Sequence, residues 1–153
     1  MNDHPAELGE IHLTRIFAAP WDLVFRCMID ADHLTHFWGP VGMSTPRETI
    51  IVDPRPGGVF ETIMVNDADG SHFPTRGIFV EVTEPERLVW RDPDSGMTTS
   101  TTFVDLGEDR TEVHIHQTNV PDFILSPEAQ AGFKTSLDRL DAYLAALSHR
   151  RTA

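Results

Sequence analysis

The sequence predicts one α+β domain in which a curved antiparallel sheet of seven strands wraps around a long C-terminal helix. From residue 46 to residue 118, short β-rich runs alternate with turn residues and leave no room for the long crossovers that parallel strands need. Downstream, apolar residues recur at steps of four, three, four and three, which is typical of one helix face. We expect a single domain over the 153 residues, with an ordered core of about 10–149.

One strand and two short helices open the predicted domain. Apolar and polar residues alternate in "EIHLTRIF" (residues 10–17), which indicates a strand with one half-buried face. From Pro20, which is tolerated at the start of a helix, apolar residues follow helical spacing. A second helix is predicted at about residues 31–37, with Asp30 as its N-cap, and the Gly-Pro pair that follows ends it.

Six further strands are predicted, because the segments between the β-rich runs carry the Gly, Pro, Asp or Asn of tight turns. The "DPRPGG" stretch is predicted to be one such structural hairpin, since no helix follows it to hold a phosphate. Together the runs predict an antiparallel meander. They are "RETIIVD" (47–53), "VFETIMV" (59–65), "TRGIFVEV" (75–82), "RLVWRD" (87–92), "TTSTTFVDL" (98–106) and "TEVHIHQT" (111–118).

A long amphipathic helix is predicted to close the domain. In the predicted loop "NVPDFILSPEAQ" (residues 119–130), Ser126 suits an N-cap and Pro127 a first helical position. About 20 residues would make a rod of roughly 30 Å, which crosses a whole sheet. One helix covers a flat sheet poorly, so we expect the sheet to curl around it and to leave a cavity. The apolar stripe comprises Phe133, Leu137, Leu140, Leu144 and Leu147.

The strand faces predict which side chains line that cavity. Period-two alternation directs one set of residues on each central strand toward the helix. Trp38, at the point where the second helix breaks, is expected to help close one end, with residues 121–125 near the other. The alternative that the pattern leaves open is a filled core. The predicted ligand-binding residues are Trp38, Phe60, Thr62, Met64, Ile78, Trp90, Thr101, Phe103, Phe133 and Leu137, with the two threonines as polar points.

The acidic composition of the chain limits the classes of partner that it can bind. Asp and Glu outnumber Lys and Arg by 24 to 12, and the net charge of −12 would repel phosphate backbones and anionic lipids. We therefore expect neither nucleic acid nor a membrane as partner. The first residues lack the basic start and apolar run of a secretory signal, and no run approaches the roughly 18 apolar residues of a membrane span. We expect a cytoplasmic protein.

No catalytic, metal or cofactor site is predicted. There is no G-x-S-x-G, the single cysteine Cys27 lies in an apolar stretch, and Glu61 and Glu81 alternate with inward residues, so they are expected at the surface. The histidine pairs 114/116 and 33/36 each share one side of an element, which would be compatible with a transition metal if a carboxylate joined them. However, Val113 and Ile115 are expected to take the buried face, which leaves the strand pair toward solvent.

Several motifs resemble the SRPBCC superfamily of helix-grip proteins, and within it the branch named after the C-terminal domain of the activator of heat-shock-protein-90 ATPase. The resemblance implies a helix-grip fold with a cavity, in small ligand-binding or stress-associated proteins without a shared catalytic triad. Phe37 and Phe133 stand where the family usually has tryptophan. The motifs are "RIFAAPWDLVF" (15–25), "FWGP" (37–40), "DPRPGG" (53–58), "GIFVEVTEPERLVW" (77–90), "TTFVDLGEDRTEV" (101–113) and "GFKTSLDRLDAYLA" (132–145).

The leading functional hypothesis is a protein that binds a small hydrophobic molecule in this cavity, without a committed catalytic residue and without a cofactor. A second hypothesis, which rests on the resemblance alone, is a co-chaperone-like activator of a heat-shock-protein-90 ATPase. A third is a cyclase or hydrolase acting on an aromatic or polyketide-like substrate, which would require an acid or base in the cavity. A monomer and a homodimer both stay open.

Overall fold

The computed structural model describes the backbone of residues 9–152 and the side chains of residues 9–147. Its described strands form one antiparallel sheet in the order β1-β8-β7-β6-β5-β4-β2, with β3 paired to β4. The strands are β1 (Gly9–Phe17), β2 (Met43–Ser44), β3 (Ile51–Val52), β4 (Val59–Asn66), β5 (His72–Thr83), β6 (Arg87–Arg91), β7 (Thr98–Gly107) and β8 (Arg110–Val120). The helices are α1 (Trp21–Cys27), α2 (Ala31–Leu34), the 3-10 turn η1 (Arg47–Thr49), α3 (Asp122–Leu125) and α4 (Pro127–Thr152).

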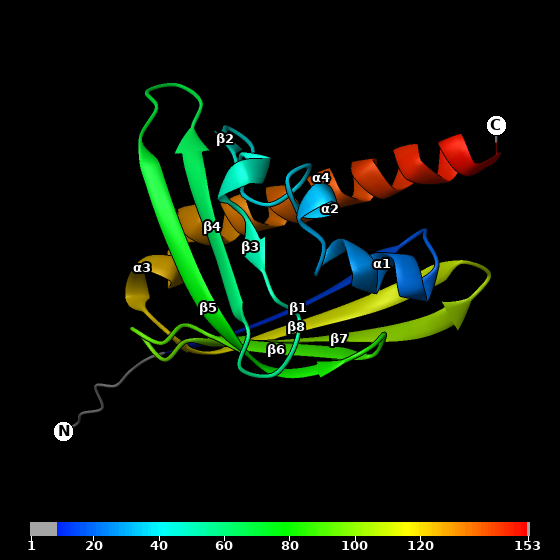
Figure 1. Ribbon diagram of the computed structural model, residues 1–153, viewed down its shortest axis with the longest axis horizontal. Helices are drawn as coiled ribbons and strands as arrows, with labels where there is room; N and C mark the ends of the chain where they lie inside the picture. The colour runs from blue at the N-terminus through cyan, green and yellow to red at the C-terminus, as the bar shows by residue number, and fades with distance from the viewer. Residues whose placement is uncertain (1–8, 153) are drawn as a thin grey trace.

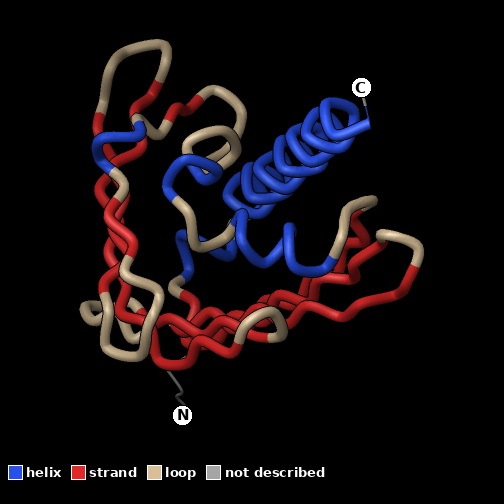
Figure 2. Tube along the Cα trace, turned by 45° about the vertical axis from the view of Figure 1, so that its right-hand side comes forward, coloured by secondary structure: helices blue, strands red, loops and turns tan. Residues whose placement is uncertain are grey.

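The sheet is bent, and the long helix α4 lies within the bend. Figure 2 shows β4 and β5 standing as one arm, while the remaining long strands form the other arm, and α4 runs along the inner side of both. The short helices α1 and α2 lie on the same inner side (Figure 1). The prediction of a curved antiparallel sheet around a C-terminal helix is confirmed. None of the described helices is long and apolar enough to cross a membrane.

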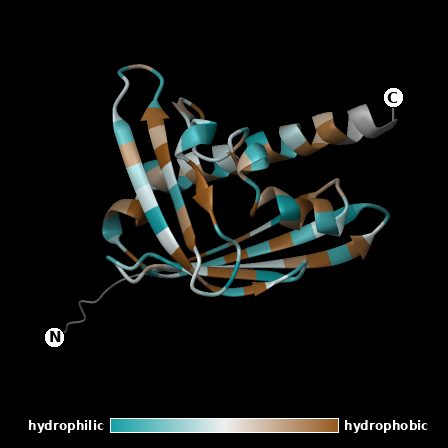
Figure 3. Cartoon of the chain, viewed as in Figure 1, coloured by the Kyte–Doolittle hydropathy of each residue, from teal (hydrophilic) through white to brown (hydrophobic). Residues whose placement is uncertain are grey.

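The main hydrophobic core lies between the sheet and the helices. Hydrophobic and hydrophilic bands alternate along the strands in Figure 3, as a sheet with one buried face requires. The predicted helix stripe faces the core: Leu137, Leu140 and Leu144 are buried, and Phe133 and Leu147 are partly buried. Ser126 accepts the N–H of Ala129 as an N-cap. The indole N–H of Trp21 donates to the carbonyl of Phe103 at 2.9 Å, which fixes α1 on β7.

The predicted strand 47–53 is wrong in its first half. Residues 47–49 form η1, and only Ile51–Val52 pair with β4. The physical reason is the proline before the turn: Pro46 has no N–H for a ladder, and its carbonyl accepts both the backbone N–H of Thr49 (2.9 Å) and the hydroxyl of the same residue (2.8 Å). These bonds close a turn where the β-rich composition predicted a strand.

Three further differences concern short elements. The eighth strand, β2, was missed because its two residues carry no periodic pattern and pair only with Val65 and Asn66 of β4. The second helix ends at Leu34, and the chain continues to Trp38 as turns in which the N–H groups of Phe37 and Trp38 bond to the carbonyl of Leu34. The predicted loop 119–130 contains the one-turn helix α3 and the start of α4, which itself extends to Thr152.

Candidate functional site

Four aromatic rings meet on the inner face of the sheet, below α4. We call Trp38, Phe60, Phe79 and Trp90 the inner aromatic cluster. The ring of Phe60 lies at its centre: its centroid is 5.0 Å from that of Trp38, 5.5 Å from that of Trp90 and 5.8 Å from that of Phe79. Two of these contacts are edge-to-face, an arrangement that aromatic quadrupoles favour. The sequence prediction placed three of the four residues together and missed Phe79.

The missed residue comes from an error in strand register. Ile78 was predicted to face inward, but Phe79 takes the inner face and is 2% exposed. The ladder between β5 and β6 shifts between Phe79 and Glu81, which leaves Val80 as an extra residue that is 54% exposed. A bulge of this kind reverses the alternation on either side of it, so Val82 faces the core as predicted while Ile78 does not.

A glycine lets Trp90 lie flat on the neighbouring strand. A Cβ atom placed on Gly77 would lie 2.7 Å from the Trp90 ring, closer than any side chain tolerates. Gly77 is directly opposite Phe60 in the ladder between β4 and β5. Because residue 77 has no side chain, the indole ring of Trp90 can pack directly on its backbone, beside Phe60.

The inner face becomes more exposed toward the hairpin between β4 and β5. Phe60 and Thr62 are buried, and Met64 is partly buried with its sulfur near Gly39. The exposure of their direct partners on β5 also rises toward the hairpin: Gly77 is buried, Thr75 is exposed, and Phe73 is 46% exposed. The hydroxyls of Thr62 and Thr75 are 2.6 Å apart. This part of the concave side is an open, largely apolar surface with one hydroxyl pair.

The remaining predicted lining residues on β7 and α4 differ in burial. Thr101, Phe103 and Leu137 are buried, and the Phe103 ring packs edge-on against Phe25 at 5.2 Å. Phe133 is partly buried at the start of α4 and packs against the main core. Of the predicted lining residues, Thr101, Phe103 and Leu137 are therefore core residues that solvent barely reaches.

The segment that carries Trp38 is fastened to α4. One guanidinium nitrogen of Arg139 donates to the carbonyls of Gly39 (2.9 Å), Pro40 (3.1 Å) and Met43 (3.0 Å). One turn before it, Ser136 donates its hydroxyl to the carbonyl of Phe37 at 2.8 Å. These bonds tie residues 37–43 to α4, and they hold Trp38 at the border of the open surface.

At the other border, α3 packs on the edge of the sheet. Ile124 and Leu125 contact a small second core made by Ile11, Met97 and Val120. Phe123 points away from it and is 74% exposed. Sequence reasoning expected residues 121–125 at this end of the molecule.

The buried polar groups of the described residues are hydroxyls and one amide. They are Thr45, Thr62, Thr99, Thr101, Thr111, Gln117 and Ser136. As predicted, Glu61 and Glu81 are surface charges, paired with Arg76 (3.6 Å) and Arg87 (3.1 Å). Cys27 is buried, and burial raises the pKa of its thiol to about 12, which suits a structural residue rather than a nucleophile.

A separate groove of about 370 Å³ opens on the surface beside α1 and α2. It is wide open and has mixed polarity. One of its two cations, Arg47, is bound to Asp32, with 2.6 Å between nitrogen and oxygen. That guanidinium holds the pKa of the Asp32 carboxyl below its usual value, mainly through the hydrogen bond. The lining residues are Arg26, Ile29, Asp30, Ala31, Arg47, Ile50 and Val52.

The predicted histidine pairs have separate surroundings. His114 and His116 share the outer face of β8, while Val113 and Ile115 are buried, as expected. His33 lies 2.6 Å from the hydroxyl of Tyr143, and the ring of His36 stacks on the same tyrosine. The helical pair therefore packs on α4.

The comparisons with known proteins agree with this architecture. The model of the family described as "Activator of Hsp90 ATPase homolog 1-like protein" matches residues 18–145. A solved structure of a Chromobacterium violaceum protein is 27% identical with a TM-score of 0.81, covering 89% of this chain and 97% of the other. A Nitrosomonas europaea protein is also 27% identical, with a TM-score of 0.77 and coverages of 92% and 96%.

A third solved structure, the AHSA1 protein from Silicibacter pomeroyi, has a TM-score of 0.75 at 23% identity and covers 90% of this chain and 99% of its own. At 23% identity, this similarity supports the fold alone. The search of curated proteins found no match.

Proposed function

The chain belongs to the family of Activator of Hsp90 ATPase homolog 1-like proteins, and from this membership and the open inner face we propose that it binds a small apolar molecule. The observation that carries the proposal is the exposure along β4 and β5. Apolar side chains that face α4 at the buried end of these strands give way to partly or largely exposed ones at the hairpin end. Phe73 is 46% exposed although it directly opposes Met64 on the same face.

An apolar ligand would lie between this arm and the start of α4. Its contacts would be Trp38, Met64, Phe73, Trp90 and Phe133. Each Å² of apolar surface that such a ligand removes from water contributes about 25 cal/mol, before the cost of immobilising the ligand. The rigid attachment of the Trp38 segment to Arg139 lowers the cost of ordering the site.

The hydroxyl pair indicates one polar feature of the ligand. Thr62 is 1% exposed and has Thr75 at 2.6 Å, whereas Thr75 reaches solvent. When Thr62 donates to Thr75, the proton of the Thr75 hydroxyl is left to donate outward. We therefore expect a ligand with one hydrogen-bond acceptor, such as a carbonyl or ether oxygen, on an otherwise apolar body.

The proposal includes no catalytic step. The polar groups buried among the described residues are hydroxyls and one amide, none of which exchanges protons near neutral pH.

The test combines native mass spectrometry of the purified protein with a titration of Nile red, a neutral apolar dye. The informative variant is Met64→Glu, which places a charge on the inner face where the side chain is partly buried. The matched control is Val80→Glu, on the neighbouring strand but on the outer face. We expect Met64→Glu to weaken dye binding at least about tenfold and Val80→Glu to leave it within about twofold.

Circular dichroism must show both variants folded. Equal dye affinity in folded Met64→Glu and wild type would overturn the proposal. So would a wild-type protein of bare mass that takes up no dye. Charging Phe103 is unsuitable for this test, since that residue is 2% exposed and packed on Phe25, so the substitution would unfold the core.

A further inference from the structure

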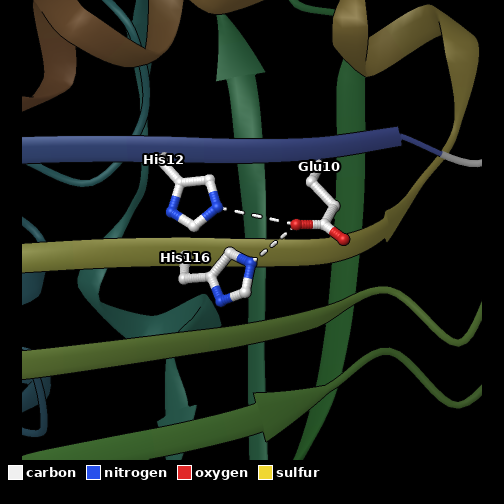
Figure 4. Close-up of side chains that lie close together, drawn as sticks. All are labelled: Glu10, His12 and His116. Carbon is white, nitrogen blue, oxygen red and sulfur yellow. Dashed lines mark hydrogen bonds and ion pairs between the residues drawn. The ribbon is translucent and has the colours of Figure 1, made fainter.

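Two histidines and a glutamate converge on the outer face of the sheet, opposite the proposed ligand surface. Glu10 and His12 lie on β1, and His116 lies on β8 (Figure 4). The antiparallel register places His12 directly opposite His116. Their rings stack with centroids 4.0 Å apart and planes inclined by 17°. Glu10 is two residues before His12, so period-two alternation places its side chain on the same face.

The potential ligand atoms all point toward one another. One oxygen, Oε1 of Glu10, lies 3.1 Å from Nε2 of His116 and 3.5 Å from Nε2 of His12. Ligand atoms of the three residues lie within 4.8 Å of one another. In a tetrahedral zinc site, bonds of about 2.0–2.2 Å put neighbouring ligand atoms roughly 3.3–3.5 Å apart. The observed atoms reach that spacing by small side-chain rotations.

The surroundings allow those rotations and leave room for further ligands. The side chains of His12 and Glu10 are 69% and 60% exposed, and that of His116 is 41% exposed. The ladder between β1 and β8 is irregular between Gly9 and Ile11, which pair with Val120 and Gln117, so the extra residue of the bulge lies on β8, opposite Glu10. Such bulges re-aim side chains at the edges of sheets. Beneath the side chains, the paired strands form a rigid backbone support.

The nearby His114 has partners of its own. Its Nδ1 lies 3.2 Å from the Thr14 hydroxyl, and its Nε2 lies 3.3 Å from a carboxylate oxygen of Glu112. The group at Glu10 is therefore a discrete three-residue set. Two imidazoles and one carboxylate match the donors that zinc and neighbouring divalent transition metals bind, with a position left for water.

We propose that Glu10, His12 and His116 bind one divalent transition-metal ion of the zinc class. The ion replaces the contacts between the carboxylate and the imidazoles with three metal bonds, and it joins the edge strand β1 to β8. A net charge of −12 attracts cations to the surface in general, but among the described residues only this set brings ligand atoms of three His, Cys, Asp or Glu side chains within 4.8 Å of one another.

The test is isothermal titration of ZnCl₂ into full-length protein that carries no polyhistidine tag and has been freed of metal with EDTA. We expect one ion per chain at micromolar concentration. His12→Gln and His116→Gln should each weaken zinc binding at least about 10–100-fold, since even residues that merely support metal ligands have effects of that size. Both substitutions fall on exposed side chains, so the fold should persist.

The matched controls are His72→Gln and His114→Gln, an exposed histidine on β5 and the neighbour on β8; both should keep the wild-type affinity. A second readout is the imidazole ¹⁵N spectrum, in which zinc should shift the ring signals of His12 and His116 and leave those of His72 in place. Either of two results would overturn the proposal: no saturable zinc binding by the wild type, or wild-type affinity in both His12→Gln and His116→Gln.

Discussion

The indole ring of Trp90 occupies the place where a side chain at Gly77 would lie, since a Cβ atom there would be 2.7 Å from the ring. The pair fixes one wall of the inner aromatic cluster. Gly77 also pairs with Phe60 across the ladder, and the Phe60 ring contacts that of Trp90. Trp90 can take this position because residue 77 has no side chain.

Gly77→Ala should therefore destabilise the protein by about 1–3 kcal/mol, as overpacking of a core does, and it should displace the Trp90 ring. Chemical denaturation measures the stability, and the tryptophan emission maximum of the folded variant reports the ring's exposure. Arg76→Ala, on the adjacent residue with an exposed side chain, is the control and should change stability by less than about 0.5 kcal/mol. A neutral Gly77→Ala with unchanged emission would contradict the packing described.

Arg139→Met should loosen the segment that carries Trp38. The substitution removes three hydrogen bonds to the carbonyls of Gly39, Pro40 and Met43 while keeping the aliphatic stem. Loss of charged donors to partly buried acceptors costs about 1.5–3 kcal/mol. Amide hydrogen exchange should accelerate in residues 37–45 and not in the strands. Lys134→Met, at an exposed position of the same helix, should leave both quantities unchanged; exchange that rises equally in both variants would refute the anchoring role.

Much of the fold follows from local patterns in the sequence. The helix stripe that includes Leu140 and Leu144 has a period that only a helix satisfies, and both residues are buried. The alternation of Val113 and Ile115 with two histidines likewise predicts which face of β8 is buried, without knowledge of its neighbours. Each of these patterns lies within about a dozen consecutive residues, so the prediction needs no information from the rest of the chain.

The candidate sites depend on information that a local pattern lacks. The wrong orientation of Ile78 comes from the bulge at Val80, which is set by pairing with β6. The contact between His12 and His116 joins residues 104 positions apart through the register of β1 on β8, so the histidine motif on β8 alone gave no reason to expect a third ligand. One signal was available: a glycine inside a β-rich run, as at Gly77, is typical of close approach by a large ring.

Cys27 should make the protein less stable in alkali. Burial, and to a lesser degree the nearby Asp30 carboxylate, raise the pKa of this thiol from about 9 to about 12. Between these values the unfolded chain has lost the thiol proton while the folded chain retains it, so the free energy of unfolding falls as pH rises, by up to about 1.4 kcal/mol per pH unit.

Denaturation of wild type and Cys27→Ala between pH 8 and pH 11 measures the effect, because this range begins below the window and covers about two units of it. The variant, which has no thiol to titrate, should show the shallower slope. Parallel slopes would mean that the thiol ionises equally well in the folded protein. A thiol reagent at neutral pH should also label Cys27 only after denaturation, since the side chain is inaccessible in the fold.

Zinc should raise the melting temperature if it joins β1 to β8 through Glu10, His12 and His116. An ion that binds only the folded chain stabilises it by about 2.7 kcal/mol at a free concentration one hundred times its dissociation constant. For a domain of this length that corresponds to about 5–10 °C. Calorimetry with and without ZnCl₂ measures the shift, and excess EDTA should reverse it.

The His116→Gln variant should lose most of this shift, whereas His72→Gln should keep it, because His72 lies on β5 away from the proposed ligands. The location of the effect gives a stricter check. Since β1 is an edge strand whose only neighbour among the described strands is β8, slowed amide exchange should be concentrated on those two strands. A melting temperature that rises equally in His116→Gln and in wild type would place the zinc elsewhere on this acidic chain.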